Sequence, residues 1–296
     1  MRLGVWSAAL ALCTAAPVAA VQTVLDTSLP ALNGTFGSGV ATTTTTAAGT
    51  TTTVSGPAGG ANRATAAPNG SWFQSDVGGG ATLGITTLLS PDGNGAAYFN
   101  TTGGASKADL RYQLATPIPL AKFASASYSF YRDGSSTVDA SITPVLRLEL
   151  LKNGGFGGSL ILEYYFQNLT APTTNSWTTV SATQTDSYFW TTNAFLGPTF
   201  GASGGRKSVA QWVADNVGTD LKVYGFTIGV GSGWAGGSFT GAADAMSFGF
   251  TDGTTASFDF AVASVPEPES WAMLVVGFAM IVGAVRRRRA GASFAG

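Results

Sequence analysis

Two glutamates are the residues of this sequence best suited to acid–base chemistry. Glu149 and Glu163 lie on either side of a glycine-rich turn. A hairpin centred on Phe156 would place them directly opposite each other, about 5 Å apart at Cβ. Carboxylates about 5.5 Å apart could serve a retaining glycoside hydrolase. The alternative is a solvated strand face whose salt bridges Arg147 or Lys152 would complete. We favour this alternative because facing like charges destabilise a sheet.

A second group of residues could bind carbohydrate. Aromatic side chains fall in or beside glycine-rich segments, where a ring can lie flat against a sugar and a nearby carboxylate can accept hydrogen bonds from its hydroxyls. The alternative is that these rings pack in the core, as most tryptophans do. The candidate glycan-binding residues are Trp177, Asp186, Tyr188, Trp190 and Trp234.

The residue types that are missing from the sequence exclude several kinds of catalytic and metal-binding site. The 296 residues contain no histidine and a single cysteine, Cys13. Nucleophilic sites built on Ser-His-Asp or Cys-His, and metal sites that need imidazole, are therefore excluded. The sequence also lacks a phosphate-binding loop, a dinucleotide fingerprint and an EF-hand pattern. We expect no catalytic residue, no metal-ligating residue and no cofactor. A structural Ca²⁺ stays open, because oxygen ligands suffice for it.

Composition favours an all-β protein from outside the cytoplasm. Only 10% of the residues are charged, 40 are glycine, and Thr, Ser and Ala are abundant. Short apolar runs separated by turn residues are typical of β-modules. Residues 21–265 carry 10 basic and 14 acidic side chains, a net charge of −4. An acidic surface argues against nucleic acid, which binds to basic surfaces.

The elements that must position these side chains are predicted by hydrophobic alternation. Leu146, Leu148 and Leu150 alternate with Arg147 and Glu149, which indicates a strand with one buried face. An apolar stripe over residues 208–216 predicts a short helix. The predicted strands cover residues 84–89, 96–100, 111–114, 125–132, 145–151, 159–166, 223–231, 246–250 and 257–262. This spacing predicts an antiparallel two-sheet sandwich, jelly-roll-like, over residues 71–264.

Residues 21–70 are expected to contain an N-terminal strand and a Thr/Gly-rich segment of low complexity. The run of threonines over residues 41–53 predicts either a surface loop, which we favour, or one exposed strand, since threonine favours β-structure.

The N-terminus has the features of a secretory signal peptide over residues 1–20. Arg2 supplies the positive charge, an apolar run follows, and Val18-Ala19-Ala20 forms a small-residue cleavage site. Cleavage there would remove Cys13, so the exported protein would have neither a disulfide nor a reactive thiol.

The C-terminal tail changes composition abruptly. A rigid acidic Pro-Glu-Pro stretch precedes an apolar span over residues 271–285 and a basic block over residues 286–289. Fifteen helical residues cover ~22 Å, which is short of a ~30 Å hydrocarbon core. An interfacial tryptophan and snorkelling arginines offset the shortfall and place the C-terminus in the cytoplasm. The residues concerned are Pro266, Glu267 and Pro268 in the motif, and Trp271, Arg286, Arg287, Arg288 and Arg289 in the anchor.

This order of motif, span and basic block resembles the PEP-CTERM sorting tail of Gram-negative bacteria. The resemblance covers residues 265–290 and implies that an exosortase, a membrane-embedded transpeptidase, recognises the Pro-Glu-Pro triad and processes the tail. The chain would be held in the inner membrane before processing. It would then reach the envelope surface or the extracellular matrix.

The last strands resemble the closing strands of concanavalin-like jelly-roll domains. The likeness rests on residues 225–234, Phe239, Asp244 and residues 258–260. Such domains often carry an Asp-Asn pair before the penultimate strand. Ala245 follows Asp244 here, so this detail differs.

The sequence as a whole predicts an exported, non-enzymatic surface or matrix protein whose sandwich binds exopolysaccharide. One alternative is a polysaccharide-active glycoside hydrolase that uses Glu149 and Glu163. Another is a purely structural adhesin with no soluble ligand.

Overall fold

The computed structural model describes residues 21–25, 42–46, 48–55, 61–63, 70, 72–199, 205–231, 233–262 and 280. The chain divides into two compact units, Met1–Val262 and Ala263–Gly296. The predicted signal peptide, Pro-Glu-Pro motif and basic block lie outside the described residues. In the described parts of the chain, no helix is both long and apolar enough to cross a membrane.

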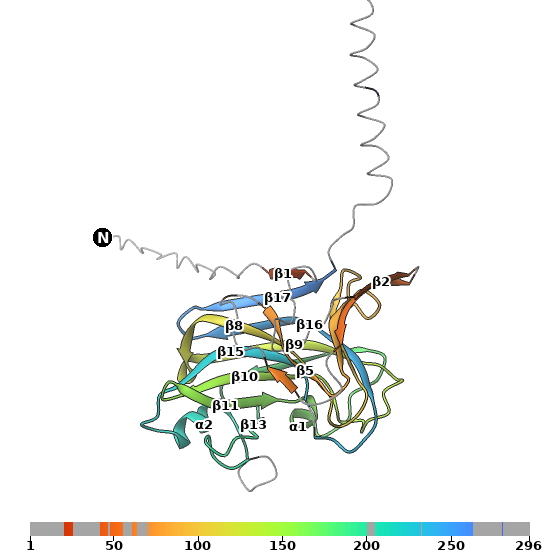
Figure 1. Ribbon diagram of the computed structural model, residues 1–296. Coiled ribbons are helices and arrows are strands. Elements are labelled where there is room, and N and C mark those ends of the chain that lie inside the picture. Colours follow the sequence, from red (N-terminus) through yellow and green to blue (C-terminus); the bar gives the residue numbers. More distant parts are fainter. Residues whose placement is uncertain are drawn as a thin grey trace, which may run out of the picture. The chain divides into compact units, whose positions relative to one another are not determined.

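The first unit is a sandwich of two β-sheets (Figure 1). Sheet A follows the order β1 (Val21–Leu25), β17 (Thr255–Ala261), β16 (Phe239–Phe250), β7 (Ala96–Thr101), β6 (Thr82–Thr86), β3 (Gly49–Ser55) and β2 (Thr42–Thr46). Two further strands of this sheet are β9 (Phe123–Arg132), which pairs with β16, and β12 (Trp177–Thr183), which pairs with β9.

Sheet B has eight strands and supplies the second layer. Their order is β14 (Arg206–Lys207), β13 (Phe189–Trp190), β11 (Gly155–Leu162), β10 (Val145–Lys152), β15 (Leu221–Val230), β8 (Lys107–Pro119), β5 (Trp72–Gly78) and β4 (Ala61–Arg63). Among the described strands, every pairing is antiparallel except that of β1 with β17. The predicted antiparallel two-sheet sandwich is confirmed.

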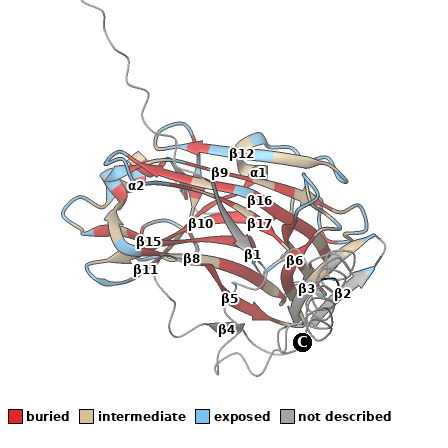
Figure 2. Cartoon of the chain, turned by 90° about the horizontal axis from the view of Figure 1, so that it is seen from above, coloured by how far each residue is buried: buried red, intermediate tan, exposed pale blue. Residues whose placement is uncertain are grey.

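Buried residues of both sheets form the core (Figure 2). Aromatic rings make up a large part of it. Phe226 of β15 stacks on Phe248 of β16, with ring centroids 4.1 Å apart and planes 9° from parallel. Trp72 of β5 meets Phe258 of β17 edge-on at 5.2 Å. Each such ring buries a large apolar area, worth about 1.5–3 kcal/mol. Contacts of this kind hold sheet A against sheet B.

The predicted strands are present, but several have different limits. Residues 111–114 are the middle of the thirteen-residue β8, and residues 246–250 are the end of the twelve-residue β16. The strand predicted for residues 159–166 stops at Leu162, because the chain then leaves the sheet and begins the helix α1 (Tyr164–Asn168). Apolar alternation located the strands but did not show where the chain turns away from the sheet.

The threonine run forms a hairpin of β2 and β3, and β3 pairs in turn with β6. The favoured prediction of a surface loop is therefore wrong. The alternative of one exposed strand is correct in secondary structure but not in number, because the run forms two strands. β-Branched side chains restrict the backbone to extended conformations, and a neighbouring strand is available to pair with them.

The predicted helix is confirmed as α2 (Val209–Asp215). Ser208 caps its N-terminus: the Ser208 hydroxyl accepts from the Gln211 backbone N–H, and the Gln211 side chain accepts from the Ser208 N–H. Val209 and Trp212 are buried against the core, and the Trp212 Nε1–H donates to the Phe189 carbonyl at 3.1 Å. The capping box therefore fixes the start of a helix that supports β13.

The stacked pair between the sheets gives a first prediction. Replacing Phe226 by Ala removes a fully buried ring and leaves a cavity between β15 and β16, so we expect a loss of about 3–5 kcal/mol in the free energy of unfolding. Chemical denaturation would measure it. Phe195→Ala is the matched control, because that ring is 70% exposed. Equal effects of the two substitutions would contradict the assignment of Phe226 to the core.

Candidate functional site

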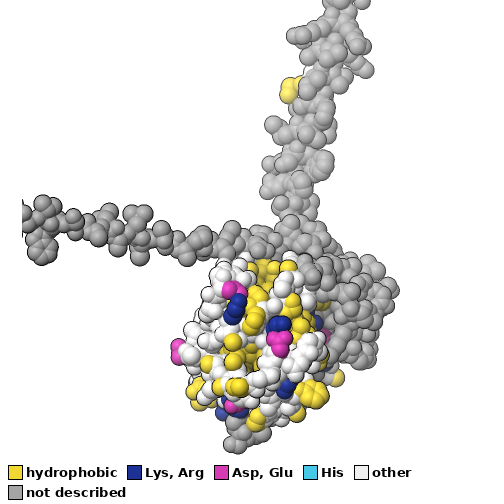
Figure 3. Space-filling model, turned by 90° about the vertical axis from the view of Figure 1, so that its left-hand side faces the viewer, with side chains coloured by type: hydrophobic (Ala, Val, Ile, Leu, Met, Phe, Trp, Pro, Cys, Tyr) yellow, Lys and Arg dark blue, Asp and Glu magenta, His cyan; other side chains and the backbone are white. Residues whose placement is uncertain are grey.

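A cleft of about 620 Å³ lies on the face of sheet B that points away from the sandwich core. The strands β5, β8, β10, β11, β13 and β15 and the loops near residues 142 and 234 contribute to it. Its charged residues are Asp76, Lys107, Asp109, Arg111, Arg147, Glu149 and Glu163, and its aromatic residues are Phe156, Phe166, Trp190 and Trp234. On the face shown in Figure 3, charged side chains are scattered among apolar and uncharged ones.

Small residues on β15 make room for the charged side chains. Phe226 and Ile228 point into the core, so Gly225, Thr227 and Gly229 face the cleft side. A Cβ on Gly225 would lie 2.6 Å from the Tyr112 carbonyl oxygen, so even alanine would clash there. Longer side chains from β8 and β10 can therefore reach each other across β15.

Two ion pairs cross this strand. Arg147 Nη1 of β10 lies 2.6 Å from Asp109 Oδ1 of β8, and Arg111 Nη2 of β8 lies 3.7 Å from Glu149 Oε1 of β10. Burial raises the pKa of Asp109 to about 6, and the charge of Arg147 opposes that rise. These pairs link three strands through side chains that water barely reaches, so the loss of one partner would leave an uncompensated buried charge.

Glu149 is fully engaged by its neighbours. Its Oε1 accepts a hydrogen bond from the Thr227 hydroxyl at 2.7 Å, and its Oε2 accepts one from the Ser159 hydroxyl at 2.8 Å. Only 3% of the residue is exposed. The expected solvated face of the hairpin is therefore wrong: the face is polar, but the walls of the cleft cover it.

Glu163 has a different environment at the end of β11, just before α1. Its Oε2 accepts a hydrogen bond from Trp190 Nε1 at 3.2 Å. Burial raises the pKa of Glu163 to about 7, while the indole hydrogen bond and the more distant Arg147 lower it. This carboxyl group therefore exchanges a proton near neutral pH.

The two glutamates do not face each other, so the predicted register is wrong. Glu149 pairs with Ser159, and Glu163 follows four residues after Ser159, just beyond the end of β11. At ~3.3 Å per residue, the backbone positions of Ser159 and Glu163 are about 13 Å apart. The hairpin turns at Asn153 and Gly154, which have φ of 52° and 79°. An Asn-Gly pair with two positive φ angles is the favoured two-residue hairpin turn. The turn therefore lies earlier than Phe156, and a bulge after Leu150 shifts the register again.

Two of the five candidate glycan-binding residues line the cleft, namely Trp190 and Trp234. Trp177 lies on β12 of sheet A against the ring of Tyr131, 5.9 Å between centroids. Asp186 accepts from the hydroxyls of neighbouring threonines in a turn. Tyr188 is 54% exposed and lies outside the residues that line the cleft.

Sequence reasoning missed the charged residues of β8. Lys107, Asp109 and Arg111 occupy alternate positions, with Ala108 and Leu110 between them pointing into the core. This alternation is visible in the sequence, but only residues 111–114 were assigned to a strand. Phe156 was also missed as a site residue; it is 56% exposed at the edge of the cleft.

Two polar atoms on the cleft wall have no hydrogen-bond partner among the described residues. They are the Thr143 hydroxyl oxygen and the Trp234 indole nitrogen. Thr143 is only 2% exposed. A buried polar group without a partner costs about 1–3 kcal/mol. Both atoms are shielded from solvent, so a bound molecule that displaced the neighbouring side chains would gain a favourable contact with them.

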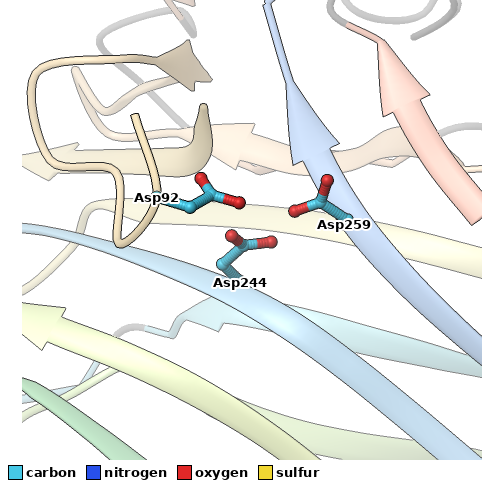
Figure 4. A group of neighbouring side chains, drawn as sticks. All are labelled: Asp92, Asp244 and Asp259. Carbon is cyan, nitrogen blue, oxygen red and sulfur yellow. The ribbon is translucent and has the colours of Figure 1, made fainter. Parts of the chain in front are cut away.

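Three carboxylates gather at another place, between the turn before β7 and the strands β16 and β17 (Figure 4). Oxygens of Asp92, Asp244 and Asp259 lie within 4.8 Å of one another. Asp244 accepts from the Phe260 backbone N–H at 3.0 Å, and Asp259 accepts from the Asn94 side-chain amide at 2.8 Å. Such oxygens could ligate a hard cation such as Ca²⁺, which takes six to eight of them.

The fold and the cleft together define an antiparallel β-sandwich with a polar, aromatic-lined cleft on one sheet. No protein-family model and no curated protein matches the chain. Solved structures similar to it include two carbohydrate-binding modules. The first is a family 11 carbohydrate-binding module from Clostridium thermocellum in complex with a β-1,3-1,4-mixed-linked tetrasaccharide: 14% identity, 60% of this chain and 88% of that chain covered, TM-score 0.33.

The second is the family 11 carbohydrate-binding module of the cellulosomal cellulase Lic26A-Cel5E from Clostridium thermocellum. It is 12% identical, with 70% of this chain and 98% of that chain covered and a TM-score of 0.31. Both scores are too low to support an argument about function, which therefore has to come from the cleft itself.

The carboxylate cluster gives a prediction about pH. Burial raises the pKa of Asp244 from 3.8 to about 7, so its ionisation is unfavourable in the folded protein. Asp244 contributes its full stabilisation at pH values below the pKa that it has in the unfolded chain. This contribution is lost as the pH rises to about 7. In chelator, Asp244→Asn should therefore gain stability relative to the unchanged protein over this range, by up to about 1.4 kcal/mol per pH unit.

Thermal or chemical unfolding at several pH values would measure this difference. Asp252→Asn is the control, because hydrogen bonds from Thr254 lower the pKa of Asp252 and the expected sign is opposite. A difference between Asp244→Asn and the unchanged protein that stays constant with pH would show that Asp244 ionises normally.

Proposed function

We propose that the cleft on sheet B binds a polysaccharide without cleaving it. One observation carries this proposal: four rings, of Phe156, Phe166, Trp190 and Trp234, share a single cleft with fixed hydrogen-bonding groups. Rings provide apolar faces for the C–H surfaces of sugars, and fixed polar groups select hydroxyl positions. The cleft volume of about 620 Å³ falls within the usual range of ~300–1,000 Å³ for ligand sites.

The positions of the carboxylates favour binding over hydrolysis. Glycosidases hold two carboxylates about 5–9.5 Å apart, whereas Glu149 and Glu163 are four residues out of register. Both oxygens of Glu149 already accept hydrogen bonds. A carboxylate held in this way is poorly placed to attack a sugar or to activate water, because it would first have to give up those contacts.

We also propose that the chain is an exported protein sorted by its C-terminal tail. The support is in the sequence: an N-terminal secretory pattern, and a Pro-Glu-Pro triad followed by an apolar span and four arginines. The partner would be an exosortase-type transpeptidase in the inner membrane. The sandwich would then bind exopolysaccharide at the cell surface or in the surrounding matrix.

Loss of the most exposed ring tests the binding site. Phe156→Ala should weaken binding to a soluble polysaccharide on the order of fivefold, since one aromatic contact contributes about 1 kcal/mol. Affinity electrophoresis or calorimetry would measure it. Trp177→Ala, on the opposite sheet, is the matched control and should leave the affinity unchanged.

The same preparations distinguish the alternatives. Binding without release of reducing ends supports the proposal. Turnover that disappears in Glu163→Gln would instead establish a glycoside hydrolase. Failure to bind any polysaccharide would favour a purely structural adhesin.

The sorting proposal makes a separate prediction. Replacing Pro266, Glu267 and Pro268 together by alanine should keep the protein in the inner membrane with its tail intact, because the processing enzyme loses its recognition motif. Cell fractionation and the mass of the C-terminal peptide would measure this. Conversion of Glu269 alone to alanine is the control. Normal release of the triple variant would contradict a role for the triad.

A further inference from the structure

The positive charges of the cleft are all matched, which bears on the kind of glycan it can hold. Among the described residues that line it, the cations are Lys107, Arg111 and Arg147. Their carboxylate partners also line the cleft: Asp76 at 3.5 Å, Glu149 at 3.7 Å and Asp109 at 2.6 Å, in that order.

One carboxyl group remains after this pairing. Glu163 has an indole N–H, not a cation, as its hydrogen-bond partner. The lining therefore carries four acidic groups against three basic ones. A sugar with a carboxylate or sulfate group would lose its hydration on entering, would meet no unmatched cation and would face a surplus acid. Burying such an anion is strongly unfavourable.

The unpartnered atoms on the cleft wall call for groups of another kind. The Thr143 hydroxyl can donate and accept, whereas the Trp234 indole can only donate. A sugar hydroxyl both donates and accepts, so it suits either atom without bringing a charge. Thr143 is nearly fully buried, and both unpartnered atoms are shielded from solvent in the free protein. The contact therefore requires the neighbouring side chains to move aside as the sugar enters.

From the matched charges and the unpartnered donors, we infer that the cleft is selective for uncharged polysaccharides, and that Thr143 and Trp234 hydrogen-bond the hydroxyls of the bound sugars. This inference rests on the proposed binding function and adds the ligand class and two specificity-determining residues. The ion pairs act as walls of the site: they remain paired while the ligand contacts the rings and the two unpartnered groups.

The test measures binding of the full chain to neutral and acidic polysaccharides of similar length. Hydroxyethyl cellulose and galactomannan serve as neutral probes, and alginate and polygalacturonate as acidic ones. We expect binding to at least one neutral probe and at least tenfold weaker binding to both acidic probes. Most of the preference should persist at high salt, since it comes mainly from the cost of dehydrating the acidic group, which salt does not screen.

Thr143→Val tests the hydroxyl contact directly. It keeps the shape of the side chain and removes an unpartnered oxygen, so the affinity for the neutral probe should fall about fivefold while the melting temperature of the free protein does not fall. Thr101→Val is the matched control with the reverse outcome. Thr101 lies outside the cleft, and its hydroxyl oxygen accepts a 3.1 Å hydrogen bond from the Phe239 N–H. This substitution should therefore lower the melting temperature and leave the affinity unchanged.

The outcomes distinguish a failure of the inferred selectivity from a failure of the proposed polysaccharide binding. Tighter binding of an acidic probe overturns the selectivity but leaves polysaccharide binding in place. Unchanged affinity in Thr143→Val overturns the assigned contact. Binding to none of the probes overturns both the inference and the proposed function.

Discussion

The two-residue alternation of the central strands of sheet B is the constraint on which the rest of the structure depends. On β10, Leu146, Leu148 and Leu150 point into the sandwich, and Arg147 and Glu149 point into the cleft. The residues of the two faces cannot be positioned independently, because a shift of the strand register by one residue would exchange the two faces. The stacking of Phe226 on Phe248 fixes the register that positions the charged residues on the other side of the same strands. The same strand register therefore determines both the packing of the core and the geometry of the cleft.

This arrangement buries a group of charges. Their pairing offsets the cost of removing them from water. Arg147 and Asp109 reach each other diagonally over β15. Gly229, the register partner of Asp109, leaves room for this contact, because a Cβ there would collide with the Asp109 carboxylate. Arg111 and Glu149 do so over Thr227, whose hydroxyl also donates to Glu149. A larger side chain at Gly229 would separate the strands or the ions. Buried ion pairs contribute little net stability, so the network is better understood as a rigid polar wall that keeps the cleft open.

The sequence predicts the layers of this molecule better than it predicts the cleft. Alternation over residues 145–151 and the apolar stripe over residues 208–216 are local patterns, and both correctly predict structure. The cleft joins residues that are distant in the chain, such as Asp109 and Arg147, and no local pattern brings them together. The hairpin register depended on recognising Asn153-Gly154 as the turn, a signal that was present in the sequence. The unpartnered oxygen of Thr143 follows only from the packed structure, since its lack of a partner is a property of the surrounding residues.

The parallel pairing of β1 with β17 limits the order in which the sandwich can be completed. Val21 pairs with Ser257, 236 residues later in the chain. A chain that emerges from a ribosome or a translocation channel presents β1 first and its partner almost last, so β1 stays without its partner strand for most of that time. Pairing over such a long separation is slow to form, and an unpaired strand can associate with other chains. Completion of sheet A is therefore a late event in folding, and a truncation before residue 255 would leave β1 with no strand to join.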